Sequence, residues 1–173
     1  MDPRLRQKRL VQKHLCYLGL VALFYLLGSI PGLFALFGIK PVWLIGLAVC
    51  IAGREGEFTG ALYGAIAGLF WEVGAGRTAG SLSLMLLCCC FVCGVVVILF
   101  LQPNVVNMTW LCGVSCFVIT GIDHIFVYWM RDGGDTMGIY FLRTLPVVLY
   151  TGAVTVIPWL LVRWVWQRFL IED

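Results

Sequence analysis

Four ionisable residues lie inside long apolar stretches, where a charge is costly and therefore a candidate for function. They are Glu72, Asp123, His124 and Arg143. If each stretch is a helix rising about 1.5 Å per residue, Glu72, Asp123 and Arg143 fall in the same half of a hydrocarbon core about 30 Å thick. We therefore expect a polar layer in which Arg143 pairs with Glu72 or Asp123.

Three roles are open for this polar layer: a salt bridge that fixes helix register, a ligand or proton site, and a site that recognises a partner. Removing one partner of a buried ion pair typically costs about 3–5 kcal/mol. Catalysis has little support, because no histidine is paired with a serine or cysteine in a recognisable arrangement and no HExxH or phosphate-cradling motif occurs. His124 adjoins Asp123, and adjacent residues on a helix point apart. We expect no catalytic residue and no enzymatic activity.

Eight cysteines also lie in apolar runs, and two pairs have spacings that could hold a metal or carry redox chemistry. These pairs are Cys90-x-x-Cys93 and Cys112-x-x-x-Cys116. Zinc sites usually add a second cysteine pair or histidines at ligand spacing, whereas Leu, Phe, Val and Gly flank these pairs. We predict that the cysteines are small packing residues, with no metal and no cofactor.

Glycine recurs every four residues from Gly56 through Gly60 and Gly64 to Gly68. Each glycine in a helix costs about 1 kcal/mol relative to alanine, so four on one face need a reason. Four residues turn a helix by about 400°, which makes these glycines a ridge without side chains. Such ridges let membrane helices approach closely. We expect internal packing of a helix central to the bundle; a groove for a ligand or partner helix is the alternative.

Composition indicates the class of protein. Of 173 residues, 61% are hydrophobic and 12% charged, whereas soluble domains average about 45–50% and about 25%. A membrane span needs about 20 apolar residues, so we expect one all-α integral membrane domain, residues 1–173, with six transmembrane helices in a compact bundle. The expected spans are residues 10–30, 33–52, 57–74, 79–101, 105–130 and 137–162, between a basic tail at 1–9 and a tail at 163–173. Lys40-Pro41 interrupts the second span, so either Pro41 starts a short helix or the preceding segment dips in from outside.

Charge asymmetry predicts the orientation of these spans. Six spans place both termini on one side, and that side would hold five cations of the N-terminal segment with Arg54, Arg163 and Arg168. The other side would hold Lys40, Arg77 and Arg131. The excess predicts cytoplasmic termini. We expect Arg54, Glu55 and Glu57 to form a solvated inner turn, and the short segments between spans to bind no nucleic acid.

The run REGEFTGALYGAIAGLFWEVGAGRTAGSLSLMLL, residues 54–87, resembles the signature region of the rod shape-determining protein MreD family. Members of that family have a polar turn, a glycine-stepped span that ends in an acidic residue, a short glycine-containing loop and a span rich in small residues and leucine. Glu72 stands where most members carry Asp. A second resemblance is Asp123 in GIDHIFVYW, late in the fifth span. The resemblance is closest over residues 53–90 and looser elsewhere.

The resemblance implies a non-enzymatic scaffold in the bacterial inner membrane that maintains rod shape during lateral cell-wall synthesis. It implies direct binding of MreC, and through MreC a link to MreB, RodA and a class B penicillin-binding protein. Membrane lipid is a further expected partner, and a homo-oligomer remains open. We expect the polar layer and the outer loop that carries Arg131, Asp132 and Asp135 to contact MreC.

An alternative comes from the substrate-binding S components of energy-coupling-factor vitamin transporters, which are also small, glycine-rich, six-span proteins and are similar in overall plan. Such a protein would hold a vitamin in a pocket in the outer half of the membrane. The polar layer is compatible with this, but the expected outer loops are too short to cover a ligand. The sequence therefore favours the scaffold.

Overall fold

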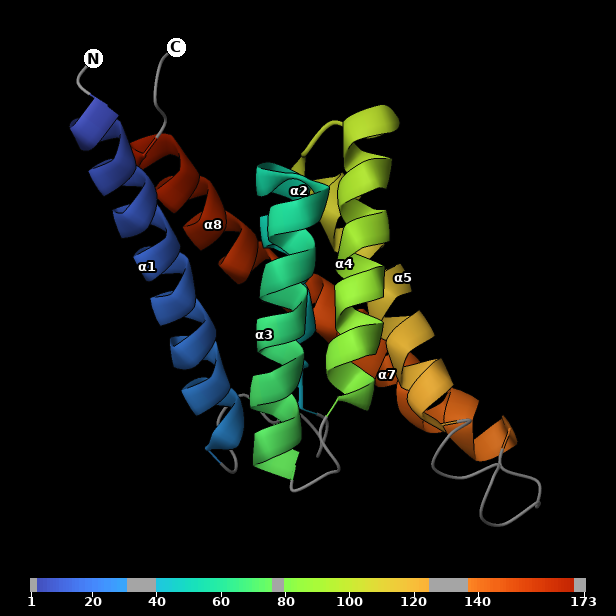
Figure 1. Ribbon diagram of the computed structural model, residues 1–173. Coiled ribbons are helices and arrows are strands. Elements are labelled where there is room, and N and C mark those ends of the chain that lie inside the picture. Colours follow the sequence, from blue (N-terminus) through green and yellow to red (C-terminus); the bar gives the residue numbers. More distant parts are fainter. Residues whose placement is uncertain (1–2, 31–39, 76–79, 125–136, 170–173) are drawn as a thin grey trace.

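The computed structural model describes residues 3–30, 40–75, 80–124 and 137–169, and these are helical with short connections. The helices are α1 (Pro3–Ser29), α2 (Trp43–Glu55), α3 (Glu57–Ala75), α4 (Ser81–Leu99), α5 (Val105–His124), α7 (Met137–Val154) and α8 (Val156–Arg168). They run alternately up and down one bundle, with α7 and α8 consecutive along a single pass (Figure 1). The all-α prediction is confirmed for the described residues.

Four helical segments among these residues are long and apolar enough to cross a membrane: Gln7–Ser29, Ser81–Leu99, Val105–Asp123 and Thr144–Arg168. The structure is therefore consistent with a multi-pass membrane protein. Helices α2 and α3, which coincide with the expected second and third spans, are not among these segments, for physical reasons. Helix α2 has 13 residues and is only about 20 Å long, and α3 carries two glutamates and several glycines that reduce its hydropathy.

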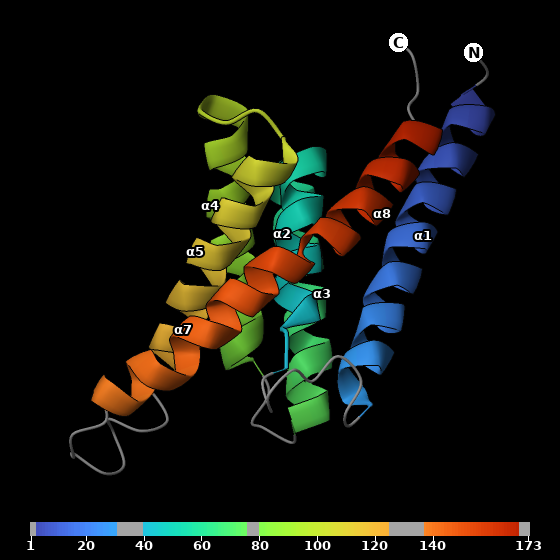
Figure 2. The same ribbon diagram turned by 180° about the vertical axis from the view of Figure 1, so that it is seen from behind.

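The start of α1 and the end of α8 lie at the same end of the bundle (Figures 1 and 2). We call this the terminal end, and the other the opposite end. The residues expected as tails are largely helical: α1 begins at Pro3 and α8 continues to Arg168. Arg, Lys, Leu and Gln are strong helix formers, so nothing in the first residues of α1 stops the helix.

Helix α2 begins two residues after Pro41, which agrees with the alternative in which this proline starts a short helix. Proline lacks a backbone N–H and has a fixed φ, so it is tolerated at helix starts. The preceding residues 31–39, which could have dipped into the membrane, lie outside the described residues. The same holds for residues 125–130, the expected end of the fifth span.

The last pass is interrupted at Thr155, between α7 and α8. Pro158 cannot donate the backbone hydrogen bond that the carbonyl of Val154 would otherwise accept. The Thr155 amide contacts the carbonyl oxygens of Thr151 and Gly152 at 3.0 and 3.1 Å, and its hydroxyl donates to the Thr151 oxygen at 2.6 Å. These bonds hold the backbone together through the break.

Helix α2, rather than α3, occupies the centre of the bundle. Every residue from Trp43 to Gly53 is buried, and α2 packs against α1, α3, α4, α5, α7 and α8. A helix that neighbours cover on all sides needs no polar face, which explains its continuous apolar sequence. Helix α3 is more peripheral, because Phe58 and Val73 are largely exposed. The expectation that the glycine-rich helix is central is therefore wrong.

The glycines of α3 nevertheless pack inside the bundle. A Cβ atom on Gly68 would overlap the backbone of Ser83 in α4, and one on Gly64 would lie 2.7 Å from the Leu86 carbonyl oxygen. A Cβ on Gly60 would overlap Ala52 in α2. Gly56 differs, because its φ of 91° makes the left-handed turn between α2 and α3. The four-residue step thus allows direct contact of α3 with two neighbouring backbones.

We predict that Gly68→Ala lowers the free energy of unfolding by about 1–3 kcal/mol, because the new methyl group must push α3 and α4 apart. Gly19→Ala is the matched control, since nothing lies within 4 Å of a Cβ at Gly19, and alanine is the better helix former. Thermal unfolding of both variants in the same detergent measures the difference. Equal melting temperatures would show that this backbone contact is not limiting.

Candidate functional site

Glu72, near the end of α3, connects that helix to the start of α4. Its side chain is 1% exposed. One carboxylate oxygen accepts from the Gly80 amide at 2.7 Å, and the other from the Leu82 amide at 2.6 Å and, more weakly, the Ser83 amide at 3.4 Å. The Ser81 hydroxyl lies 3.5 Å from the second oxygen. The carboxylate therefore caps α4.

This cap is needed because the residue before α4 is Gly80, with a φ of 118° and no side chain to bond the first amides. The initial N–H groups of a helix have no partner within the helix, and negative charge there is favoured by the helix dipole. Glu72 supplies both acceptor and charge from the neighbouring helix. Ser83 adds a second connection, because its hydroxyl donates to the Ala65 carbonyl oxygen at 2.8 Å. Glu72 is thus a structural joint between two closely packed helices.

The structure places Asp123 near the end of α5, at the same end of the bundle as Glu72. In the described ranges α3 packs against α1, α2 and α4, whereas α5 packs against α2, α4, α7 and α8. Both overall views show α5 and α7 leaning away from α3 at this end (Figures 1 and 2). The two carboxylates thus share an end of the bundle but lie on helices that do not pack together.

The other residues of the expected polar layer and loop remain predictions. The side chains of His124 and Arg143 lie outside the described residues, as do Arg131, Asp132 and Asp135 entirely. The pairing of Arg143 with Glu72 or Asp123 is therefore untested. Glu72, however, already has several hydrogen-bond donors around it, so its burial needs no arginine to explain it.

A polar network at the terminal end was not anticipated. Lys13 Nζ of α1 lies 2.6 Å from Glu55 Oε2 of α2, with the two side chains 13% and 10% exposed. The Tyr17 hydroxyl donates to Glu55 Oε1 at 2.8 Å. Beside them the Tyr63 hydroxyl donates to the His14 carbonyl oxygen at 3.1 Å and lies 3.0 Å from His14 Nδ1. This network joins α1 to α2 and α3, so the expected solvated turn is wrong for Glu55.

A sequence signal for this network existed. Lys13 and Tyr17 are four residues apart on α1, so they share a face. Their spacing indicates a polar stripe along one side of α1. The partner Glu55 is distant in sequence, and only the arrangement of helices identifies it.

Arg54 is also held among other side chains. Its guanidinium lies 5.5 Å from the ring centroid of Trp159 and 5.1 Å from that of Trp166, and its Nη2 donates weakly to the Pro103 carbonyl oxygen at 3.4 Å. The Arg163 guanidinium lies 5.1 Å from the same Trp159 ring. We call Arg54, Trp159, Arg163 and Trp166 the arginine–tryptophan cluster. The solvated-turn expectation is wrong for Arg54 too.

The cysteines pack as small apolar side chains. All eight are free, and those of the two suggestive pairs are buried. Cys93 Sγ lies 3.2 Å from the Ser115 hydroxyl, and Cys112 Sγ lies 3.0 Å from the Thr155 hydroxyl oxygen. Within the described ranges no group of three or more His, Cys, Asp or Glu side chains is placed to hold a metal ion.

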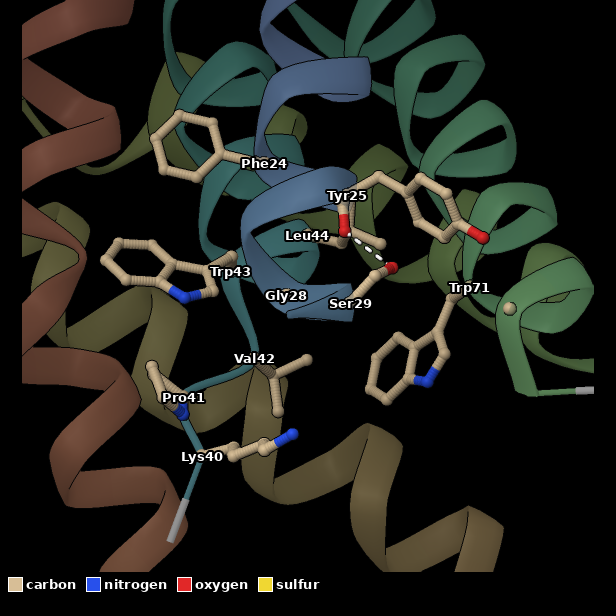
Figure 3. Close-up of a pocket in the computed structure, with 11 residues that line it drawn as sticks. Phe24, Tyr25, Gly28, Ser29, Lys40, Pro41, Val42, Trp43, Leu44 and Trp71 are labelled. Carbon is tan, nitrogen blue, oxygen red and sulfur yellow. Dashed lines mark hydrogen bonds between the residues drawn. The ribbon is translucent and has the colours of Figure 1, made fainter. Parts of the chain in front are cut away.

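A cavity of about 570 Å³ opens at the opposite end of the bundle, between the end of α1, the start of α2 and the end of α3 (Figure 3). Aromatic side chains dominate its walls, and Lys40 adds a cation. Its lining residues are Phe24, Tyr25, Gly28, Ser29, Lys40, Pro41, Val42, Trp43, Leu44, Trp71 and Gly74. Its volume falls within the range typical of small-molecule pockets.

We predict that Glu72→Ala lowers the free energy of unfolding by about 1–3 kcal/mol, because it leaves the amides at the start of α4 without their acceptor. Glu72→Gln keeps one oxygen and should cost less. Glu57→Ala is the control, because it removes the other glutamate of α3. Thermal unfolding of the three variants checks the order, and a Glu57→Ala loss as large as that of Glu72→Ala would contradict the capping role.

No family model, no curated protein and no solved structure matches this chain. Its functional assignment depends on the arrangement described above: a carboxylate joint at one end, a polar network and an arginine–tryptophan cluster at the other, and one aromatic cavity.

Proposed function

We propose that this chain is a MreD-like scaffold of the bacterial inner membrane, without enzymatic activity, that maintains rod shape by binding MreC. Through MreC it would connect MreB, RodA and a class B penicillin-binding protein. The observation that carries the proposal is that the described residues form almost only helices, which pack on one another. Of the described residues 90% are helical, and the strongest polar contacts join one helix to another. Such a chain acts through helix faces and short loops.

The arrangement of charges supports an orientation with both termini in the cytoplasm. Lys13, Arg54, Arg163 and Arg168 lie at the terminal end with the start of α1 and the end of α8. Cytoplasmic ends of membrane helices carry an excess of Lys and Arg. The cavity and the Glu72 joint would then lie towards the outer surface.

A groove of about 400 Å³ between α5 and α7 supports a place for MreC. It is largely apolar, and small residues form part of it: a Cβ on Gly113 would have its nearest neighbour at 3.9 Å, and one on Gly152 at 3.7 Å. Small residues let a transmembrane helix approach closely. The loop with Arg131, Asp132 and Asp135 connects these two helices in the sequence. The single span of MreC would lie in the groove and meet this loop at its outer end.

We predict that filling the groove with Gly113→Leu and Gly152→Leu reduces co-purification of MreC by about tenfold or more, because each added side chain removes space for the partner helix. Gly19→Leu is the matched control, since Gly19 is exposed on α1 with nothing within 4 Å. Neutralising Arg131, Asp132 and Asp135 tests the loop. The scaffold proposal fails if all correctly inserted variants retain MreC and restore rod shape to cells depleted of the native protein.

The aromatic cavity supports the second candidate, a substrate-binding S component of a vitamin transporter. Its volume suits a small molecule, and Trp43, Trp71 and Lys40 offer stacking surfaces and a positive charge. In the proposed orientation it would open towards the outer half of the membrane, where such a component takes up its substrate.

Thermal unfolding with a mixture of water-soluble vitamins separates the two candidates. A ligand at 100 times its dissociation constant adds about 2.7 kcal/mol of stability. If the chain is a scaffold, we expect no vitamin to raise the melting temperature. A rise that Trp71→Ala abolishes, and that Trp110→Ala outside the cavity leaves intact, would instead assign the chain to vitamin transport.

A further inference from the structure

The arginine–tryptophan cluster holds two cations against one aromatic ring. Arg54 comes from the last turn of α2 and Arg163 from α8, and both guanidiniums lie within 5.5 Å of the Trp159 ring centroid. Trp166 covers Arg54 as well. Cation–π contacts fix the two groups in place, but they do not neutralise the charges.

Two buried hydrogen-bond donors of this cluster have no acceptor in the part of the chain that the structure describes. A guanidinium has five N–H donors, and the acceptor found for Arg54 is the Pro103 carbonyl oxygen at 3.4 Å. These two donors are Arg54 Nε and Trp159 Nε1, which are buried and have no partner among the described residues. Buried polar groups in native proteins are nearly always bonded, so these donors are available to an acceptor from outside the described residues.

No carboxylate of the described residues forms an ion pair with either arginine. The nearest in sequence, Glu55, is engaged by Lys13 and Tyr17. The pair Arg54 and Arg163 therefore presents concentrated positive charge at the terminal end of the bundle. Arg163 is exposed, so an anion can reach it from outside the protein.

We propose that this cluster binds the phosphate group of an anionic phospholipid, whichever of the two functions above the chain performs. Arginine recognises phosphate through paired, charge-assisted hydrogen bonds. Basic pockets between membrane helices on the cytoplasmic side bind acidic headgroups. Tryptophan and arginine are both enriched in the headgroup region. The guanidiniums of Arg54 and Arg163 hold the phosphate oxygens.

The surface beside the cluster favours a lipid over free phosphate. Ile157 and Leu160 of α8 are about half exposed, which leaves an apolar strip on the same helix as Arg163. The acyl chains of a bound phospholipid lie along this strip while its phosphate meets the arginines.

The test uses the full-length protein in a neutral detergent and counts bound phosphatidylglycerol by native mass spectrometry. We expect Arg54→Gln and Arg163→Gln each to weaken binding about tenfold or more, since each removes a charged hydrogen-bond donor. Arg168→Gln is the matched control: it removes the same charge from the same helix end, but its guanidinium lies over Trp164, and we expect less than about a twofold change. Equal effects of all three variants would reveal general surface attraction and overturn the proposal.

Three further arms complete the test. Because Arg54 is partly buried, Arg54→Lys, which keeps the charge but loses the paired geometry, is included in case Arg54→Gln does not fold; it should weaken binding as well. Arg163 is exposed, so retained binding in Arg163→Gln overturns the proposal without that ambiguity. Neutral diacylglycerol should bind weakly, and inorganic phosphate alone should not displace the lipid. If diacylglycerol binds equally well, or inorganic phosphate displaces the lipid, the site does not select a phospholipid.

Discussion

The structure depends on direct contact between helix backbones. Apolar side chains gain little from leaving lipid for another apolar surface, so close packing has to hold membrane helices together. Gly60, Gly64 and Gly68 supply that packing, because α3 rests on Ala52 of α2 and on the Leu86 and Ser83 region of α4. Each of these glycines lowers the intrinsic helix propensity of α3 relative to alanine. Any side chain at these positions would separate the helices that surround the core.

This close packing determines where polar groups can lie. Helix α2 is surrounded by other helices and is apolar throughout its buried length, and the two carboxylates that join helices, Glu55 and Glu72, lie near helix ends. At one end Glu72 caps α4, whose preceding glycine cannot cap it. At the other, Lys13, Tyr17 and Glu55 connect α1 to α2. These polar contacts at the two ends set the register of the helices, because the apolar contacts between them do little to distinguish one register from another.

Several surfaces of the bundle remain accessible to other molecules. The groove between α5 and α7 suits a helix, the aromatic cavity suits a small molecule, and the arginine–tryptophan cluster suits an anion. These surfaces lie at different places on the bundle and differ in chemistry, although α2 contributes Trp43 to the cavity and Arg54 to the cluster. The proposed protein partner and the proposed lipid would therefore bind at once, because neither occupies the other's site.

The sequence by itself determined that the chain is helical and membrane-like, that Pro41 interrupts the second apolar stretch, and that the glycines of α3 favour close packing. These features follow from composition, local backbone geometry and the helical repeat, all of which involve residues near one another in the chain. Only the tertiary structure decided which helix is central and which groups pair. Glu72 could be recognised as a buried carboxylate, and Glu55 as a charge beside a turn. Their partners depend on which helices adjoin them, because hydrogen bonds and ion pairs act over a few ångströms in space, whatever the separation in sequence.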